Sequence, residues 1–382
     1  MPNPLTWVEI ERGALTHNLK EFRRLIGKKR TLAAVVKANA YGHGISQVSE
    51  IAVQTEADWL AVNSLEEALI LQEKKIKKPI LVLGYVPISN LKTAIKHGFR
   101  LTVYNRETIQ HLSKEARKIK KRALLHLKVE TGTNRQGITE ENLLSYVRRI
   151  KQEPYLKLEG LSTHFANIED TTDHSYAQCQ LEKFKRILSI LQKERVKIPI
   201  RHTACTAATI LFPETYFEMV RVGIGLYGLW PSKETYLSCL QNGKKAISLK
   251  PVLTWKTRIA QIKTVPAGSF IGYGCTFRTS RKTRLAILPV GYYDGYDRGL
   301  SNLAYVLING KRAPVRGRIC MNITLVDVTD IPQAKLEDEV VLLGKQDKEK
   351  ITAEYLAGLC GSINYEIVSR INSEIPRIVI HR

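Results

Sequence analysis

The first 230 residues of this sequence alternate regularly between strand-like and helix-like segments, and this alternation constrains the fold more than any other feature. Between short apolar runs rich in β-branched residues lie segments whose apolar residues recur every three to four positions, which is typical of amphipathic helices. In one of these segments, Ser64 and Glu67 form a predicted capping box that would begin a helix. The expected strands are 31–37, 59–62, 80–84, 101–104, 123–129, 156–165, 200–204 and 220–226.

Eight such alternations favour an α/β fold with a (β/α)8 TIM-like barrel, because parallel strands need crossover helices and eight strands close a barrel. A doubly wound open sheet is the alternative that the pattern leaves open. The pattern changes near Trp230-Pro231, and at 382 residues the chain is long for a single core. We therefore predict a barrel domain of residues 1–240 and a mainly-β domain of residues 241–382.

The second domain is expected to consist of short strands with turns between them. The dipeptide Asn309-Gly310 stands between two apolar runs and is typical of a β-hairpin turn. One helix is expected around residues 352–360. The expected strand regions are 252–264, 285–290, 303–308, 324–328 and 340–343.

The formal net charge of +23 suggests nucleic-acid binding, because a basic surface attracts phosphate. The basic residues, however, stand among glutamates at helical spacing, and no nucleic-acid motif accompanies them. Solvated helix faces are the better interpretation, so we expect neither a nucleic-acid partner nor a metal site. The surplus of positive charge favours anionic ligands.

The N-terminus has neither a basic start nor an apolar core, so no secretory signal is recognised. No apolar run is long enough to span a bilayer. The six cysteines form no C-x-x-C pair, and a chain of this length needs no disulfides to hold a core. These features predict a cytoplasmic protein with reduced thiols and no membrane partner.

Polar residues follow several expected strands at their C-terminal ends, where barrel enzymes carry their catalytic groups. Lys37 closes the first strand before a turn of small residues, a position where an amine can be partly desolvated and act as a nucleophile. A lysine that extends from the strand end into solvent is the alternative. Later strand ends supply Lys128, Arg135, His164 and His202.

The last two expected strands of the barrel end in residues suited to a phosphate group. Thr206 opens a predicted helix, whose hydroxyl and free amides can bind an anion. Arg221 and Gly223 close the eighth strand, and glycine lets the backbone approach a ligand closely. Each signal is weak alone, but together they place an amine, imidazoles, two arginines and a phosphate cradle at one rim.

The segment AVVKANAYGHG resembles the cofactor-lysine signature of alanine racemase, a fold-type III pyridoxal-phosphate enzyme family. The resemblance continues over essentially the whole chain, in the family's order, through KVETGTNRQG, THFAN, HTACTAAT, VRVGIGLYG, GYGCTF, LPVGYYDGYDR, GRICMN and INYEIVSRI. It implies a pyridoxal 5'-phosphate-dependent isomerase that interconverts L- and D-alanine and supplies D-alanine for peptidoglycan. It also implies a head-to-tail homodimer whose active sites contain residues of both subunits.

The same resemblance implies a role for individual residues. Lys37 is similar to the lysine that binds the cofactor and acts as base on one face of the substrate. Tyr273 is similar to the base for the opposite face, supplied by the other subunit. The implied substrate-binding residues are Arg135, Tyr292 and Met321, with Lys128 at an often carbamylated position and Arg298 and Arg318 in the access channel. The implied cofactor-binding residues are Lys37, Tyr41, His164, Thr206, Arg221, Gly223, Ile224 and Tyr365.

Racemisation explains why these residue types are needed together. One base cannot easily reach both faces of a fixed carbon, so a lysine and a tyrosine must stand on opposite sides. An ordinary tyrosine has a pKa of about 10 and needs neighbours such as His164 and Arg135 to favour its phenolate. Arg221, expected at the ring nitrogen of the cofactor and oriented by His202, cannot accept a proton there. The ring is then a weaker electron sink, which limits side reactions.

Two positions depart from the family's pattern. Cys205-Thr206 stands where Asn-Ser is usual, and the threonine keeps the hydroxyl. Asn322 replaces the more usual aspartate after Met321, which puts a charge near the substrate in doubt. A serine or broader-specificity racemase is therefore an alternative, since a pocket discriminates poorly between side chains differing by one hydroxyl. A decarboxylase of the same fold type would want an acid at Arg221, and single-domain cofactor-binding proteins lack the β domain.

Overall fold

The computed structural model describes residues 4–241 and 247–381. The chain divides into two compact units, each described by itself below. The first, here called the barrel unit, consists of Ala14–Ala38 and Val48–Lys250. The second, here called the β unit, consists of Met1–Gly13, Asn39–Gln47 and Pro251–Arg382.

The described part of the barrel unit contains eight parallel strands in the order β8-β7-β6-β5-β4-β3-β2-β9. The end strands β8 and β9 are joined by two backbone hydrogen bonds, Arg221 N to Ala204 O at 3.0 Å and Glu218 N to Arg201 O at 3.2 Å. The predicted barrel is confirmed, because these bonds close the series that an open sheet would leave apart. The strands are β2 (Thr31–Val35), β3 (Trp59–Val62), β4 (Ile80–Val82), β5 (Arg100–Val103), β6 (Ala123–Lys128), β7 (Leu156–Ser162), β8 (Ile200–His202) and β9 (Met219–Val222).

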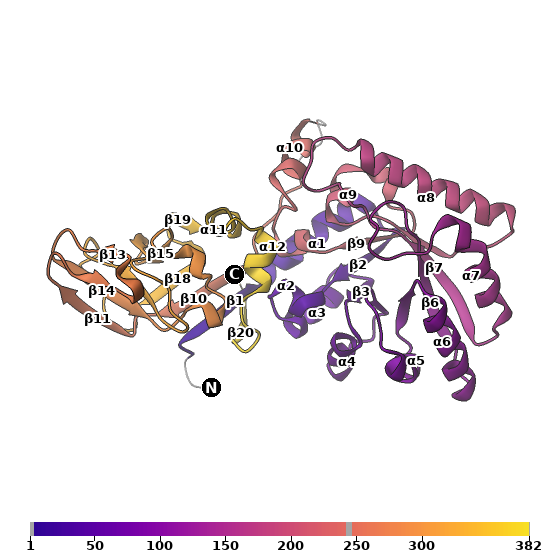
Figure 1. Ribbon diagram of the computed structural model, residues 1–382, viewed down its shortest axis with the longest axis horizontal. Coiled ribbons are helices and arrows are strands. Elements are labelled where there is room, and N and C mark those ends of the chain that lie inside the picture. Colours follow the sequence, from indigo (N-terminus) through magenta and orange to yellow (C-terminus); the bar gives the residue numbers. More distant parts are fainter. Residues whose placement is uncertain (1–3, 242–246, 382) are drawn as a thin grey trace. The chain divides into compact units, whose positions relative to one another are not determined.

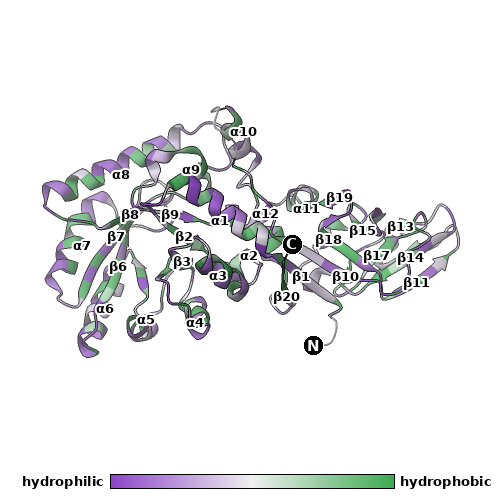
Figure 2. Ribbon diagram, turned by 180° about the vertical axis from the view of Figure 1, so that it is seen from behind, coloured by the Kyte–Doolittle hydropathy of each residue, from purple (hydrophilic) through white to green (hydrophobic). Residues whose placement is uncertain are grey.

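Helices follow the strands around the outside of the barrel (Figure 1). Ile109, Leu112 and Ala116 are buried on α6 at the spacing of one helix face, and Figure 2 shows hydrophilic and hydrophobic residues mixed along α6 and α8. The predicted capping box is present at α4, where Ser64 and Glu67 bond reciprocally. The helices are α1 (Arg12–Ile26), α3 (Ile45–Gln54), α4 (Leu65–Glu73), α5 (Leu91–His97), α6 (Arg106–Lys118), α7 (Glu140–Gln152), α8 (Ser175–Lys193), α9 (Thr206–Leu211) and α10 (Lys233–Gln241).

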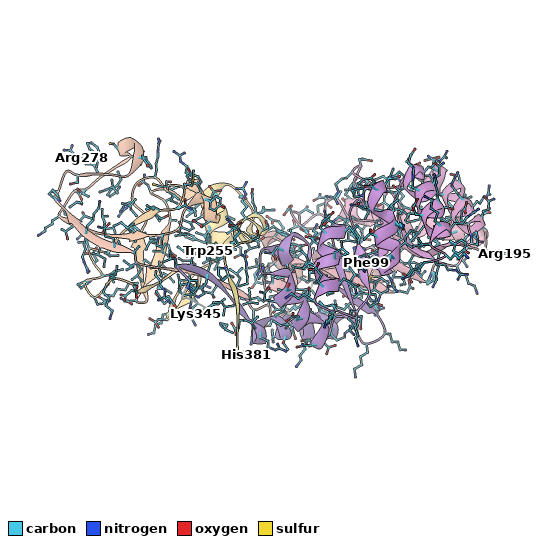
Figure 3. All side chains as sticks on the ribbon, turned by 90° about the horizontal axis from the view of Figure 1, so that it is seen from below. Phe99, Arg195, Trp255, Arg278, Lys345 and His381 are labelled. Atoms are coloured by element: carbon cyan, nitrogen blue, oxygen red, sulfur yellow. The ribbon has the colours of Figure 1, made fainter. Side chains whose placement is uncertain are left out.

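The β unit contains a seven-stranded sheet in the order β16-β15-β18-β10-β1-β20, with β19 paired to β18. Sheets β11-β14-β17 and β12-β13 complete its described strands. Trp255 on β10 is buried, whereas Lys345 on β18 is exposed (Figure 3). The strands are β1 (Thr6–Glu11), β10 (Leu253–Arg258), β11 (Gln261–Val265), β12 (Phe270–Ile271), β13 (Phe277–Arg278), β14 (Thr283–Leu288), β15 (Tyr305–Ile308), β16 (Lys311–Pro314), β17 (Thr324–Asp327), β18 (Glu339–Gln346), β19 (Glu349–Ile351) and β20 (Arg377–Ile380).

The structural division differs from the expected domain boundaries in three described segments. Residues 4–13 and 39–47 group with the C-terminal part of the chain instead of with the barrel, and residues 247–250 group with the barrel. The physical reason for the first is β1, which pairs antiparallel with β10 and parallel with β20 and buries Val8 and Ile10. The expected helix near residue 352 is present as α11 (Ala353–Cys360) and is followed by α12 (Asn364–Ser369).

In the described part of the chain, no helix combines the length and the apolar character needed to cross a membrane.

The predicted hairpin at Asn309-Gly310 is confirmed. Ile308 on β15 pairs with Lys311 on β16, so Asn309 and Gly310 form the whole turn between the two strands. Both have positive φ, 50° for Asn309 and 70° for Gly310, as a two-residue turn matching the strand twist requires.

We predict that Gly310→Ala lowers the free energy of unfolding by about 1–2 kcal/mol, because an L-residue is disfavoured in this left-handed region. The added Cβ would also lie 2.4 Å from Asp347 Oδ2. The matched control is Gly358→Ala on the exposed face of α11, where nothing lies within 4 Å of the added atom. That change should raise the free energy of unfolding by about 0.5–1 kcal/mol, because glycine weakens a helix interior. Urea titrations measure both, and shifts of the same sign would contradict the prediction.

Candidate active site

A cavity of about 290 Å³ opens among the C-terminal ends of the barrel strands. Residues at or near the ends of all eight barrel strands contribute to it, so the barrel brings together side chains that are far apart in the sequence. Asn63 and Gly84, which follow β3 and β4, complete part of its wall. The sequence-predicted residues that line it are Lys37, Lys128, Arg135, His164, His202 and Arg221.

The lining of this cavity is strongly basic. Lys37, Lys128, Arg135 and Arg221 contribute to it, and its described lining residues include no aspartate or glutamate. Burial, and then the positive charge of Arg135, lowers the pKa of Lys37 below its ordinary value. The same two causes lower the pKa of Lys128 to about 8, and its Nζ donates a hydrogen bond to Gln136 Oε1 at 3.3 Å. The cavity therefore combines attraction for anions with amines that lose their protons easily.

The segment that follows Lys37 has an unusual backbone conformation. In α2 (Lys37–Tyr41), the φ angles of the four residues from Ala38 to Tyr41 lie between 51° and 54°, so this segment is a left-handed turn. Such a turn costs L-residues roughly 1–2 kcal/mol each. On its barrel side, Ala38 N donates to Glu67 Oε1 at 2.6 Å. Further on, Asn39 Oδ1 accepts from Ile45 N at 2.8 Å, and backbone strain of this kind is concentrated at functional sites.

Arg221 is buried, and the surrounding backbone and imidazoles satisfy its guanidinium. Its Nη1 donates to His202 Nδ1 at 2.5 Å and to His202 O at 2.9 Å. Its Nη2 donates to Thr163 O at 2.9 Å and Thr203 O at 3.1 Å, and lies 3.5 Å from His164 Nδ1. Burial lowers the pKa of Arg221 to about 10, which leaves it charged near neutrality.

The two histidines beside Arg221 are neutral. Burial, and then the charge of Arg221, lowers the pKa of both His164 and His202 well below the ordinary value. Because a guanidinium can only donate, His202 Nδ1 must be the acceptor in its bond with Arg221.

The predicted phosphate-binding residues of the barrel unit lie together at the ends of β8 and β9. Thr206 is the first residue of α9, and its Oγ1 accepts a hydrogen bond from Gly223 N at 3.0 Å. Ile224 begins the 3-10 helix η3 (Ile224–Tyr227). Cys205 makes no side-chain hydrogen bond at the helix cap. Thr206, Gly223 and Ile224 are not among the described lining residues of the cavity. Thr206 follows β8, whereas Gly223 and Ile224 follow β9, the strand that carries Arg221.

The other predicted site residues belong to the β unit. The rings of Tyr41 and Tyr365 lie 6.1 Å apart. Tyr273 begins the 3-10 helix η4 (Tyr273–Cys275) between two glycines with positive φ, and its side chain is 73% exposed. Tyr292 and Met321 are both exposed, on loops that backbone hydrogen bonds join, including Tyr292 N to Cys320 O at 3.0 Å.

The two arginines expected in the access channel also lie in the β unit. Arg298 lines a cavity of about 400 Å³ together with Tyr292 and Arg370. Arg318 lies beside Gly274, because a Cβ at that glycine would be 3.0 Å from its guanidinium. Within the described ranges, no group of three or more His, Cys, Asp or Glu residues is placed to hold a metal ion.

The sequence interpretation missed several residues that shape the cavity and its surroundings. Gln136 follows Arg135 directly in the motif and could have been included. His126 is two residues before Lys128 on the same strand, so strand alternation places it on the same face. Glu159 gave no signal, because its position depends on an irregularity in β7.

Comparisons with known proteins agree on one family. Residues 10–231 match the family model described as alanine racemase, N-terminal domain, and residues 252–379 match alanine racemase, C-terminal domain. An alanine racemase of Leptospira interrogans is 41% identical over 377 residues, covering 98% of this chain and 96% of that protein. Another, from Methanococcus maripaludis, is 41% identical over 376 residues, covering 98% of each.

Solved structures are similar to this chain over its whole length. An alanine racemase of Clostridium difficile 630 has a TM-score of 0.94 at 33% identity, covering 100% of this chain and 97% of that one. An alanine racemase of Bacillus anthracis with bound L-Ala-P has a TM-score of 0.92 at 35% identity, covering 100% and 96%.

We predict that Lys128→Met raises the free energy of unfolding of the protein without bound ligand near pH 7. Below pH 8 the amine is charged in both states, so the folded state bears the full cost of burying it. That cost declines as the pH rises from about 8 toward 10.5, where the unfolded amine also loses its proton. Urea titrations in buffer free of carbon dioxide measure the difference, with Lys185→Met on exposed α8 as the control. A gain as large at pH 10.5 as at pH 7 would contradict it.

Proposed function

The chain belongs to the alanine racemase family, and from that premise we propose a two-base interconversion of L- and D-alanine in which Lys37 and Tyr273 exchange the substrate's α-proton. The activity is that of an amino-acid racemase, an isomerase. The observation that carries the assignment of Lys37 is its place in a basic cavity where burial lowers the pKa of its amine. A lowered pKa increases the fraction of neutral amine, which is the form that can take a proton.

We propose pyridoxal 5'-phosphate as the cofactor, bound to Lys37. The donor set fits this group, because the cavity offers cations and no described carboxylate to a ligand that carries a phosphate. When bound, the cofactor stabilises negative charge at the substrate's α-carbon. Thr206 would supply a hydroxyl for its phosphate, Gly223 and Ile224 would supply backbone, and Tyr41 and Tyr365 would supply phenols. His164 and Arg221 would stand beside its ring.

The remaining residues bind the substrate and move its proton. Lys37 serves one face of the α-carbon, and Tyr273 serves the other. Arg135 carries a permanent positive charge for the substrate carboxylate. Lys128, whose pKa is about 8, has a substantial neutral fraction, and only a neutral amine can react with carbon dioxide to form a carbamate. A carbamate there would place a negative charge beside Arg135.

Tyr292 and Met321 complete the substrate end, and we propose that they and Tyr273 come from the second subunit of a homodimer. Each active site then contains residues of both chains. The ligands named in relatives' structures, L-Ala-P and cycloserine, are small molecules, which supports a small amino-acid substrate here. We further propose a role in supplying D-alanine for peptidoglycan in the cytoplasm, in line with six free cysteines.

Arg221 decides which reactions this site favours. Its guanidinium only donates hydrogen bonds, and its partners His202, Thr163 and Thr203 hold it in a fixed orientation. A carboxylate at this position would stabilise a proton on the ring nitrogen of the cofactor, whereas the positive charge of Arg221 would disfavour a proton there. We propose that an unprotonated ring withdraws electrons from the substrate's α-carbon only moderately. Return of the α-proton to that carbon is then favoured over transamination.

We predict that Arg221→Glu lowers the rate of racemisation by at least tenfold and raises transamination, because a carboxylate would hold a proton at the position Arg221 faces. Chiral analysis of alanine measures the first, and pyruvate formation measures the second. Arg221→Lys, which keeps a positive charge that cannot accept a proton, is the control and should not increase transamination. Unchanged rates and partition in Arg221→Glu would contradict the prediction.

The proposed function is tested by mixing two inactive variants. Wild-type protein with pyridoxal phosphate should convert L-alanine to a racemic mixture, while Lys37→Ala and Tyr273→Phe should each be nearly inactive. In a heterodimer of the two variants, one site has both lesions and the other has neither. Random exchange makes about half of the dimers mixed, so the mixture should regain roughly a quarter of wild-type activity. If mixed dimers form and stay inactive, Tyr273 does not serve the partner's site.

A further inference from the structure

Behind Arg221, a series of buried polar side chains continues into the barrel. His202 Nε2 lies 2.8 Å from His126 Nδ1. His126 Nε2 lies 3.4 Å from Glu159 Oε2, which also accepts from Arg100 Nε at 3.2 Å. His126 and His202 are almost completely buried, and Glu159 is 8% exposed. The function proposed above uses Arg221 and His202, but neither His126 nor Glu159.

The hydrogen bonds fix the proton positions in the series. Because Arg221 can only donate, His202 accepts at Nδ1 and carries its proton on Nε2. That proton is donated to His126 Nδ1, so His126 carries its own proton on Nε2 and donates it to Glu159. Burial lowers the pKa of both histidines, which keeps each with a single proton.

Glu159 is a carboxylate suited to the end of this series. Burial alone would raise its pKa, but the hydrogen bond from His126 and the charge of Arg100 bring the pKa below the ordinary value. An ionised carboxylate has only acceptors, so it accepts a hydrogen bond from His126 and cannot donate one back. The opposite tautomer of His126 would carry its proton on Nδ1 and donate it to His202 Nε2, which would reverse the direction of the hydrogen bonds in the series.

The local backbone is arranged to form this contact. The pairing of β6 with β7 shifts so that Leu125 faces Leu158 while His126 faces Gly160, which leaves Glu159 as an extra residue in β7. Such a bulge redirects a side chain. A Cβ at Gly160 would lie 2.2 Å from His126 Nδ1, so the glycine provides the space for the imidazole.

We propose that Glu159 is a positioning residue that, through His126, fixes the tautomer of His202 and thereby holds Arg221 in its donating orientation at the cavity. Its effect on catalysis rests on the proposed function, whereas its effect on the tautomers does not. Without the carboxylate, His202 could carry its proton on Nδ1, which would place two N–H groups against each other across the 2.5 Å contact with Arg221.

The test is Glu159→Gln in the holoenzyme. An amide can both donate and accept, so it no longer selects one tautomer of His126. The downfield proton NMR signals of the buried ring N–H groups, assigned with His126→Phe, report the tautomers. We expect sharp signals in the wild type and shifted or multiple signals in Glu159→Gln. In steady-state assays, kcat should fall roughly fivefold to tenfold while KM changes less than twofold.

Two further variants separate positioning from a merely structural effect. Gly160→Ala breaks the series at His126 and should produce the same NMR and kinetic changes. Glu218→Gln removes the carboxylate of another barrel ion pair, with Arg201, and should change neither the histidine signals nor kcat by more than twofold. In a His126→Phe background, Glu159→Gln should have no additional effect on kcat.

Each outcome decides the proposal. Unchanged histidine signals in Glu159→Gln, or a loss of kcat no larger than in Glu218→Gln, would overturn it. If the signals shift but the wild type does not racemise alanine, the proposed function fails and the tautomer role stands. If Glu159→Gln does not fold, Glu159→Asp keeps the charge but withdraws it by one methylene, and unchanged signals there would overturn the proposal as well.

Discussion

The buried guanidinium of Arg221 sets the conditions for the rest of the barrel's interior. A buried charge is costly unless the groups around it satisfy it, and here backbone carbonyls and imidazoles accept all its recorded hydrogen bonds. Its charge reaches further, because it contributes to lowering the pKa of Lys37, Lys128, His164 and His202. Together with burial, this one cation favours the neutral forms of its neighbours, and neutral amines and imidazoles are the forms that can accept protons.

The backbone around Lys37 shows how the fold presents this chemistry. Lys37 follows a buried strand of the barrel unit, and the left-handed turn after it carries the chain into a segment that belongs to the β unit. Each residue of that turn is disfavoured locally, so the turn persists only because its surroundings compensate for it. Arg377 contributes within the β unit, where it donates to Gly42 O at 3.1 and 3.0 Å. The strained turn fixes the position of Lys37 just after the strand.

Periodicity in the sequence predicts the barrel because each strand and helix is local and repeats the same pattern. It does not predict β1, because Thr6–Glu11 pairs with Leu253–Arg258, and nothing local specifies a partner so distant. The residues of the cavity could be predicted because they stand at strand ends, where alternation and topology bring them together. Glu159 could not, since one extra residue in β7 reverses which face its side chain occupies. His126 is an intermediate case. Strand alternation predicts the face of β6 on which it lies, but not its hydrogen-bond partners, His202 and Glu159.

The concentration of positive charge in the cavity links stability to binding. Burying Lys37 and Lys128 beside Arg135 and Arg221 lowers the stability of the folded chain when no anion is present, because like charges repel at short range in a medium of low polarity. A ligand that binds only the folded state stabilises it by RT ln(1 + [L]/Kd), about 2.7 kcal/mol at a hundredfold excess over Kd. An anionic ligand that also neutralises these charges gains affinity from the repulsion it relieves. The charge pattern that destabilises the empty barrel is therefore the same pattern that selects its ligand.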